Sequence, residues 1–212
     1  MIQDIWPKHL DNQYKNLKPG NEDTVFYFQG SSLLARPSGH FNSQNPEENV
    51  LIYPQYDEFV QGIKSSYGDK AVDNFEFIYL LSIDEEHFFL ARKTGSLERG
   101  TFLGEMADSA VHKDMYSFVR GYEFIGVDSF RKAQPREHAY AAITAFHLYG
   151  WYRDNHFCGR CGKPLKHDDK QRMLRCDCCK NMVFPKICPA VIVAVTDKDR
   201  ILLTKYAGRT YR

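Results

Sequence analysis

The chain has 212 residues, of which 43% are apolar and 14% aromatic, a composition typical of a globular protein with one sizeable core or two modest ones. Its 28 lysines and arginines nearly balance its 27 aspartates and glutamates, so no broad positive field is available to hold nucleic acid by charge alone. The N-terminus lacks the basic start and apolar stretch of a signal peptide, and no apolar run approaches the roughly 18 residues that span a bilayer. We therefore expect a cytoplasmic protein with no membrane partner.

The N-terminal part of the chain is predicted to be mostly β. Residues 29–32 are a turn-forming segment between two apolar runs, which is typical of a hairpin. Residues 38–48 predict a surface loop, and residues 57–67 predict a helix because Phe59, Val60 and Ile63 have helical spacing. An acidic turn is predicted at 82–86. Five runs rich in β-branched and aromatic residues predict strands, at 24–28, 33–35, 75–81, 87–91 and 101–103.

A longer helix and a second hairpin are predicted in the C-terminal part. Pro135 suits the first turn of a helix that continues to Trp151. Its apolar face is formed by residues three and four positions apart, namely Ala139, Ala142, Ile143, Phe146 and Tyr149. Residues 190–195 and 200–204 predict two strands, and residues 196–199 predict the turn that joins them.

All six cysteines fall between positions 158 and 188, which favours a metal site over a disulfide framework. Two Cys-x-x-Cys pairs, Cys158 with Cys161 and Cys176 with Cys179, are separated by 14 residues. Four thiolates at about 2.3 Å from one ion form a closed tetrahedron, which predicts a structural zinc site. Iron in a rubredoxin-like site fits the same ligands, and reduced core cysteines are the alternative. We interpret Cys178 as a spare thiol and Cys188 as a small buried residue.

Three other patterns favour ordinary structural roles. Histidines recur every nine residues, which is two and a half helical turns, so successive rings at His138, His147 and His156 fall on opposite faces. An aromatic group beside the cysteines is more typical of a core than of a base-stacking site: Tyr149, Trp151 and Tyr152. Four basic residues among the cysteines form a solvated face or a small basic patch: Lys163, Lys166, Arg172 and Arg175.

Four parts of the C-terminal sequence together resemble the NADH pyrophosphatase family of Nudix hydrolases. They are the run from Asn155 to Gly162, the second cysteine pair, the run from Val183 to Val195, and Ile201-Leu-Leu203. The resemblance covers about residues 140–212. It implies an α+β architecture in four parts: a β-rich N-terminal domain at 1–132, a connecting helix at 133–153, a zinc ribbon at 154–187 and the first hairpin of a Nudix α/β/α domain at 188–212. It also implies a homodimer that hydrolyses NADH or NAD to nicotinamide mononucleotide and AMP with Mg or Mn, and in some members removes NAD caps from RNA.

The resemblance places the catalytic carboxylates of the family in a Nudix box, which is expected beyond Arg212. Neither candidate substitute fits, because Glu137 is not followed by a Glu-Glu pair and the acidic run at 84–86 falls in a predicted turn. We therefore expect these 212 residues alone to lack hydrolase activity. Phe184, directly before Pro185, matches the aromatic residue with which the family stacks on a substrate ring. Phenylalanine in place of the more frequent tyrosine keeps the stacking and loses a hydroxyl hydrogen bond.

Two further functions compete with the enzyme hypothesis. The zinc ribbon is a candidate binding module for RNA, DNA or a protein, although a net charge of +1 makes salt-sensitive binding hard to sustain. Alternatively, the ribbon is purely structural, and exposed apolar strands near the C-terminus then favour dimerisation or aggregation.

Overall fold

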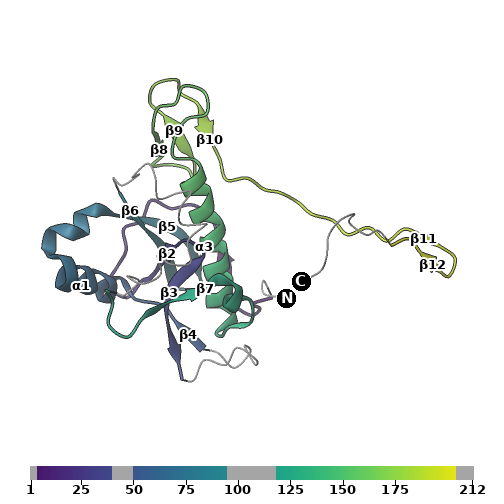
Figure 1. Cartoon of the computed structure of the whole chain (residues 1–212), viewed down its shortest axis with the longest axis horizontal. Coiled ribbons are helices and arrows are strands. Elements are labelled where there is room, and N and C mark those ends of the chain that lie inside the picture. Colours follow the sequence, from purple (N-terminus) through teal and green to yellow (C-terminus); the bar gives the residue numbers. More distant parts are fainter. Residues whose placement is uncertain (1–3, 40–49, 95–117, 204–212) are drawn as a thin grey trace, which may run out of the picture.

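The structure is a computed structural model of the chain and describes residues 4–39, 50–94 and 118–203 (Figure 1). Within these residues it is a mixed α+β protein, as predicted. Two α-helices are present among the described residues, α1 (Tyr56–Tyr67) and α3 (Arg136–Asp154). Two short 3-10 helices accompany them, at Asp69–Asn74 and Val127–Lys132. No described helix has the length and hydropathy to cross a membrane.

Seven of the described strands form one mixed sheet in the order β1-β5-β6-β2-β3-β4, with β7 also paired to β3. All pairings are antiparallel except that of β2 with β6, which is parallel. The predicted hairpins are confirmed as β2 with β3 and β5 with β6. The strand bounds are β1 Leu10–Asp11, β2 Thr24–Gln29, β3 Ser32–Ser38, β4 Val50–Ile52, β5 Phe75–Ile83, β6 Glu86–Lys93 and β7 Glu123–Gly126.

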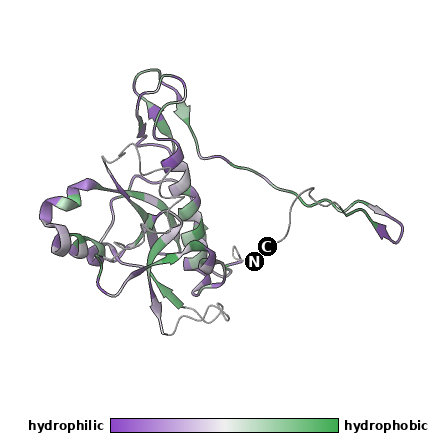
Figure 2. Cartoon of the chain, viewed as in Figure 1, coloured by the Kyte–Doolittle hydropathy of each residue, from purple (hydrophilic) through white to green (hydrophobic). Residues whose placement is uncertain are grey.

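The two faces of the sheet are covered by different helices, because successive side chains along a strand point to opposite faces. Val25 packs in one core with Phe59 of α1, whereas Phe26 packs in the other core with Ala142 of α3. The apolar residues concentrate on the central strands in Figure 2. The predicted apolar positions of the first helix, Phe59, Val60 and Ile63, are all buried, so its helical period is confirmed.

The long helix α3 leads from the sheet to the cysteines, as predicted (Figure 1). Pro135 precedes the helix as its N-cap residue instead of lying in the first turn. Among the aromatic residues near its end, Trp151 and Tyr152 are buried and Tyr149 is half-buried, which confirms the core role predicted for this group.

The predicted C-terminal hairpin is present but shorter than expected. It consists of β11 (Thr196–Asp197) and β12 (Arg200–Ile201), and the Leu202 N–H donates to the Val195 carbonyl at 2.9 Å, whereas residues 190–194 are extended without a strand partner. The polar segment that we expected to be a turn thus forms much of the hairpin, with Lys198 at a positive φ in the connection. Residues 190–194 form no strand because β-rich residues need neighbouring strands, and these have none among the described segments. The predicted strand at 101–103 and most of the predicted loop at 38–48 lie outside the described residues.

Candidate metal centre

A small sheet after α3 carries the cysteines. Its strands, in the order β10-β9-β8, are antiparallel: β8 (Leu165–His167), β9 (Leu174–Cys176) and β10 (Met182–Val183). Cys158 and Cys161 lie in the loop before β8, Cys176 is the last residue of β9, and Cys179 lies in the loop between β9 and β10. Two loops on short strands therefore supply two sulfurs each, which is the arrangement of a zinc ribbon.

The two cysteine loops have the same backbone geometry. In the first, Cys158 donates its N–H to the Lys163 carbonyl at 2.8 Å and its own carbonyl accepts from the Gly162 N–H at 2.8 Å. In the second, Cys176 donates to the Asn181 carbonyl and accepts from the Lys180 N–H, both at 2.9 Å. These bonds close a tight turn around each pair, so both side chains of a Cys-x-x-Cys sequence point to one place.

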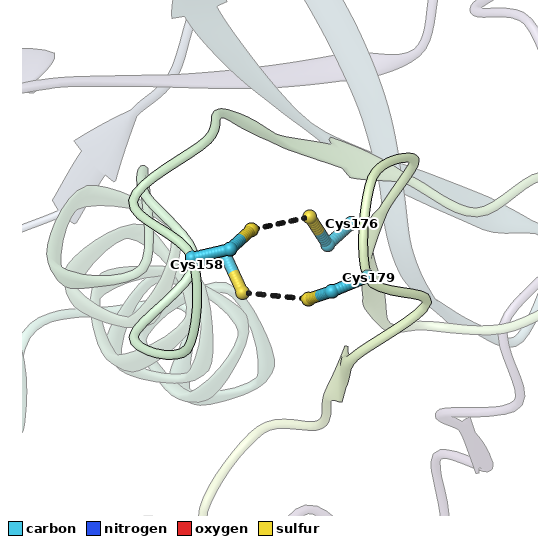
Figure 3. A group of neighbouring side chains, drawn as sticks. Cys158, Cys176 and Cys179 are labelled. Atoms are coloured by element: carbon cyan, nitrogen blue, oxygen red, sulfur yellow. Dashed lines mark hydrogen bonds between the residues drawn. The ribbon is translucent and has the colours of Figure 1, made fainter.

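The four sulfurs converge on one point. All four ligand atoms lie within 4.8 Å of one another, with Sγ–Sγ distances of 3.5 Å between Cys158 and Cys179 and 3.4 Å between Cys161 and Cys176 (Figure 3). Sulfurs at about 2.3 Å from a tetrahedral zinc ion would lie about 3.8 Å apart, which is within this range. The distances exclude disulfides, whose sulfurs are bonded at about 2.05 Å. The site therefore fits one zinc ion with four thiolate ligands.

A backbone N–H lowers the pKa of the first cysteine of each loop, whereas sulfur contacts with the other loop raise the pKa of Cys161 and of Cys179. The Arg160 N–H donates to the Cys158 sulfur at 3.4 Å, and this bond lowers the pKa of the Cys158 thiol to about 6. The N–H of Cys179 similarly lowers the pKa of the Cys176 thiol. Since each of these two cysteines belongs to a different loop, both loops contribute an acidified ligand. The Asn181 side chain adds a further contact, with its Nδ2 at 3.7 Å from the Cys158 sulfur.

The remaining cysteines lie outside this cluster. Cys178 is exposed between two ligands, in agreement with a spare thiol. Cys188 is also exposed, so its predicted burial is wrong. The reason is that the chain beyond Phe184 extends away from the ribbon instead of packing on the body of the molecule (Figure 1). Phe184 follows β10 directly and is 49% exposed.

The ribbon contacts the N-terminal sheet through side chains that the sequence analysis did not single out. Arg172 donates from Nη2 to the Leu80 carbonyl of β5, and its guanidinium carbon lies 5.9 Å from the centre of the Tyr14 ring. The Tyr14 hydroxyl in turn lies 3.5 Å from Nδ1 of His167 in β8. We expected Arg172 on a solvated face, and this is wrong because the sequence does not show which side of a three-stranded ribbon meets the rest of the protein.

The predicted basic patch on the ribbon does not include all four residues. Lys166 forms an ion pair with Asp177 at 2.6 Å, and Arg175 is directed to the Met182 sulfur at 3.9 Å. Lys166 and Arg175 are directly opposite each other on β8 and β9 and both are exposed, so they share one face, whereas Arg172 is turned to the sheet.

No second metal cluster occurs in the part of the chain that the structure describes: the four cysteines are the one group of three or more His, Cys, Asp or Glu side chains that converges. His138 pairs with Glu86 at 2.6 Å, whereas His156 contacts the Phe157 ring. His138 and His156 thus lie in separate contacts. Glu85 lies in the connection between β5 and β6. Glu137 lies in the first turn of α3, where the helix dipole stabilises a carboxylate.

Comparisons with known proteins identify short similar stretches. No family model matches the chain. A stretch of 55 residues, 26% of this chain, is 38% identical to 20% of the protein named NAD-capped RNA hydrolase NudC from Pseudomonas aeruginosa. A stretch of 55 residues is 40% identical to 20% of the Pseudomonas putida protein of that name, and a stretch of 59 residues is 36% identical to 23% of the Salmonella typhi protein. The match therefore spans about a fifth of the length of these relatives.

Proposed function

We propose that this chain, which is related through this shared stretch to the NudC family of NAD-capped RNA hydrolases, is the zinc-binding and substrate-contacting part of an NAD(H) pyrophosphatase. The reaction is hydrolysis of the pyrophosphate bond of NADH or NAD to nicotinamide mononucleotide and AMP, with NAD-capped RNA as a further substrate. The observation that carries this proposal is the similarity of 36 to 40% to proteins of that name. The converging sulfurs agree with the zinc ribbon that the resemblance implies.

The zinc ion in this proposal is structural. Four thiolates complete its tetrahedron, so no position is open for water or substrate. Cys158, Cys161, Cys176 and Cys179 would hold it, and the ion would fix two loops that have little core of their own. The ribbon then presents β10 and the segment that follows it in a defined orientation.

A catalytic Mg or Mn ion does not fit the described residues, because no group of carboxylates converges there. The sequence likewise has no helix with the Glu-Glu pair of a Nudix box, since its two Glu-Glu pairs lie at 47–48 and 85–86, outside the described helices. We therefore assign no catalytic residue to this chain. Pyrophosphate cleavage needs carboxylates from a Nudix box that these residues do not contain.

The proposed substrate contact is Phe184. Its ring is half exposed at the end of β10, and it precedes Pro185, whose fixed φ limits the directions the chain can take. A planar aromatic side chain in such a place suits stacking on a nicotinamide or adenine ring. Assembly as a homodimer belongs to the same proposal and rests on the resemblance alone.

The test measures zinc content and release of nicotinamide mononucleotide from NADH on one sample of the purified chain, with Mg or Mn added. We expect about one zinc per chain and no product. A chimera that joins residues 1–187 to the Nudix domain of the Pseudomonas aeruginosa relative is expected to form product, and less of it when Phe184 is replaced by alanine. If the 212-residue chain by itself formed product, it would have to contain catalytic residues, and our conclusion that it has none would be wrong. A zinc-loaded chimera without activity would refute the proposed function.

The alternative is a ribbon that binds nucleic acid through its own basic residues, of which Lys166 and Arg175 share an exposed face. Lys166 is paired with Asp177, and Arg172 is directed to Leu80. A nucleic-acid phosphate would have to compete with both contacts.

A further inference from the structure

Four buried polar atoms at the junction between the ribbon and the N-terminal sheet have no hydrogen-bond partner among the described residues. They are the hydroxyls of Tyr79 and Tyr152, Nε2 of His167 and Nε of Arg172. We call these four residues the junction cluster. They come from β5, from α3, from β8 and from the loop that leads to β9. Buried polar atoms in native proteins almost always have a partner, so four of them in one place require one from outside the described residues.

Contacts between side chains show that these residues form one group. The Tyr152 and His167 rings lie 5.6 Å apart. The Tyr14 ring lies 5.2 Å from the His167 ring and 5.9 Å from the guanidinium carbon of Arg172. A cavity of about 360 Å³ lies beside them, and its lining includes Tyr14, Tyr79 and His167. A ligand in this cavity can therefore reach the cluster, and because the four polar atoms are buried, only a small ligand can do so.

Arg172 carries a charge that no described carboxylate offsets. Burial disfavours the charged guanidinium and lowers the pKa of Arg172, and the side chains that oppose this effect are all tyrosines. Other cations near the cluster each have a carboxylate partner, namely Lys15 with Asp11, Arg92 with Glu76 and Lys166 with Asp177. An arginine stays charged in a protein, and a buried charge is normally paired. The partner expected at Arg172 is therefore an anion.

The hydrogen-bonding roles of the cluster also suit an anion. The Nε–H of Arg172 can only donate, and a ligand there leaves intact the bond from Nη2 to the Leu80 carbonyl. Burial lowers the pKa of His167, so its ring is neutral near pH 7. This ring donates from Nε2 when the Tyr14 hydroxyl, 3.5 Å away, donates to Nδ1. With the two tyrosine hydroxyls, four donors are available to one acceptor, and water in that place would leave the charge of Arg172 unpaired.

Two carboxylates line the same cavity, and neither acts on the charge of Arg172. Glu76 is paired with Arg92 at 2.7 Å, so its charge is offset. Asp169 is exposed to solvent, where water and salt screen its charge. The local excess of positive charge therefore lies at Arg172, which favours an anion at the cluster over one elsewhere in the cavity.

We propose that the junction cluster binds one small oxyanion such as inorganic phosphate, which accepts hydrogen bonds from Arg172 and from the hydroxyls of Tyr79 and Tyr152. An oxyanion suits donors from four parts of the chain better than chloride does, because it offers several acceptor oxygens. The bound ion links the ribbon to both the sheet and α3, and so fixes the orientation of the ribbon. This role goes beyond the proposed function and does not depend on pyrophosphate hydrolysis.

The test is isothermal titration calorimetry of inorganic phosphate into the zinc-loaded 212-residue chain at about 0.1 M sodium chloride. We expect saturable binding of one phosphate per chain in the presence of this chloride. Tyr152→Phe and Tyr79→Phe each remove one hydroxyl and should weaken binding about tenfold, because a hydrogen bond to a charged group is worth at least that factor. Tyr53→Phe is the matched control, since its hydroxyl is also buried without a described partner but Tyr53 lies outside the cavity lining. This control should stay within about twofold of the parent.

A second pair of variants tests the charge. Arg172→Gln keeps a donor for the Leu80 carbonyl and removes the charge, so we expect phosphate to bind about 100-fold more weakly. Arg175→Gln removes the same charge from an exposed position of β9 and should stay within about twofold of the parent. Circular dichroism and zinc content check that each variant is folded. Hydrogen–deuterium exchange locates the site, because phosphate should slow exchange in β8 and β9 and leave α1 unchanged.

Three results would overturn the inference: no saturable binding of phosphate, equal weakening by Tyr53→Phe and Tyr152→Phe, or binding of AMP as tight as that of phosphate. AMP carries a phosphate on a nucleoside that is too large to reach buried donors, so equal affinity would place the anion on the surface. None of these results depends on hydrolysis of NADH. Failure of the proposed function would instead appear as an inactive zinc-loaded chimera.

Discussion

Gly162 and Lys180 occupy equivalent positions in the two cysteine loops. Each follows the second cysteine of its pair, each has a positive φ, +70° and +59°, and each donates its N–H to the carbonyl of the first cysteine, at 2.8 and 2.9 Å. A side chain with a Cβ is strained in this region of φ, so the first loop has the favoured residue and the second does not. Two halves of one site thus reach the same geometry with different backbone strain.

Substitutions at Lys180 and Gly162 should change the stability of the protein in opposite directions. Lys180→Gly is expected to raise the free energy of unfolding by about 1 kcal/mol, and Gly162→Ala to lower it by a similar amount. Urea denaturation of the zinc-loaded chain measures both. Gly159→Ala is the matched control, because Gly159 has no positive φ and open space around its Cβ position. If Gly159→Ala costs as much as Gly162→Ala, the conformational argument is wrong.

Only four of the six cysteines should matter for zinc. Cys176→Ser is expected to reduce zinc content well below one per chain, since a serine hydroxyl is a poor replacement for a buried thiolate ligand. Cys178→Ser and Cys188→Ser should retain the metal, because both thiols are exposed and outside the cluster. Elemental analysis after dialysis distinguishes the two groups. Loss of zinc from Cys178→Ser would contradict the ligand assignment.

Zinc retention should decrease with acidification. The Arg160 N–H lowers the pKa of the Cys158 thiol to about 6, so this ligand is a thiolate at neutral pH and is protonated as the pH falls through that value. Protons then compete with the metal, and we expect zinc transfer to a colorimetric chelator to rise steeply toward pH 6 and below. Arg160→Ala keeps the backbone N–H and should leave the midpoint unchanged. A shift of the midpoint of zinc release to higher pH in this variant would mean that the side-chain charge of Arg160, and not its backbone N–H, lowers the pKa of Cys158.

The contact of the ribbon with the sheet should depend on Arg172. Arg172→Ala removes the hydrogen bond to the Leu80 carbonyl and leaves that buried acceptor unsatisfied, which is expected to cost about 1 to 3 kcal/mol of unfolding free energy. Arg175→Ala, at an exposed position of β9, should stay within about 0.5 kcal/mol of the parent. Equal effects of the two substitutions in denaturant titrations would show that Arg172 has no special role.

The apolar segment after the ribbon should promote self-association. Val191, Ile192 and Val193 are 83%, 103% and 73% exposed, and exposed apolar chain without strand partners is prone to pair with another chain. Ile192→Lys is expected to weaken association about tenfold or more, because burial of one such side chain is worth about 1.5 to 3 kcal/mol. Light scattering during size-exclusion chromatography measures the effect. Thr196→Lys adds the same charge at a polar position and should have a smaller effect.

The sequence by itself determined the features that depend on local spacing. The helical period of Phe59, Val60 and Ile63 and the hairpin around Gly30 were predicted correctly, because periodicity and turn chemistry act over a few residues. The cysteine ligands were likewise identified from two Cys-x-x-Cys pairs, and the structure brings their sulfurs together. The relationship to NudC proteins could also be inferred from sequence motifs.

Only the tertiary structure decided which surfaces meet. In the structure Arg172 contacts the Leu80 carbonyl instead of lying on a solvated face, Cys188 is exposed, and residues 190–194 have no strand partner among the described residues. The fold also brings Tyr152 to Arg172 in a cluster of buried polar side chains. These outcomes depend on contacts between residues far apart in the chain, such as the 92 positions between Leu80 and Arg172. Local spacing contains no information about such pairs, because the free energy that selects them comes from burial and hydrogen bonding in the assembled fold.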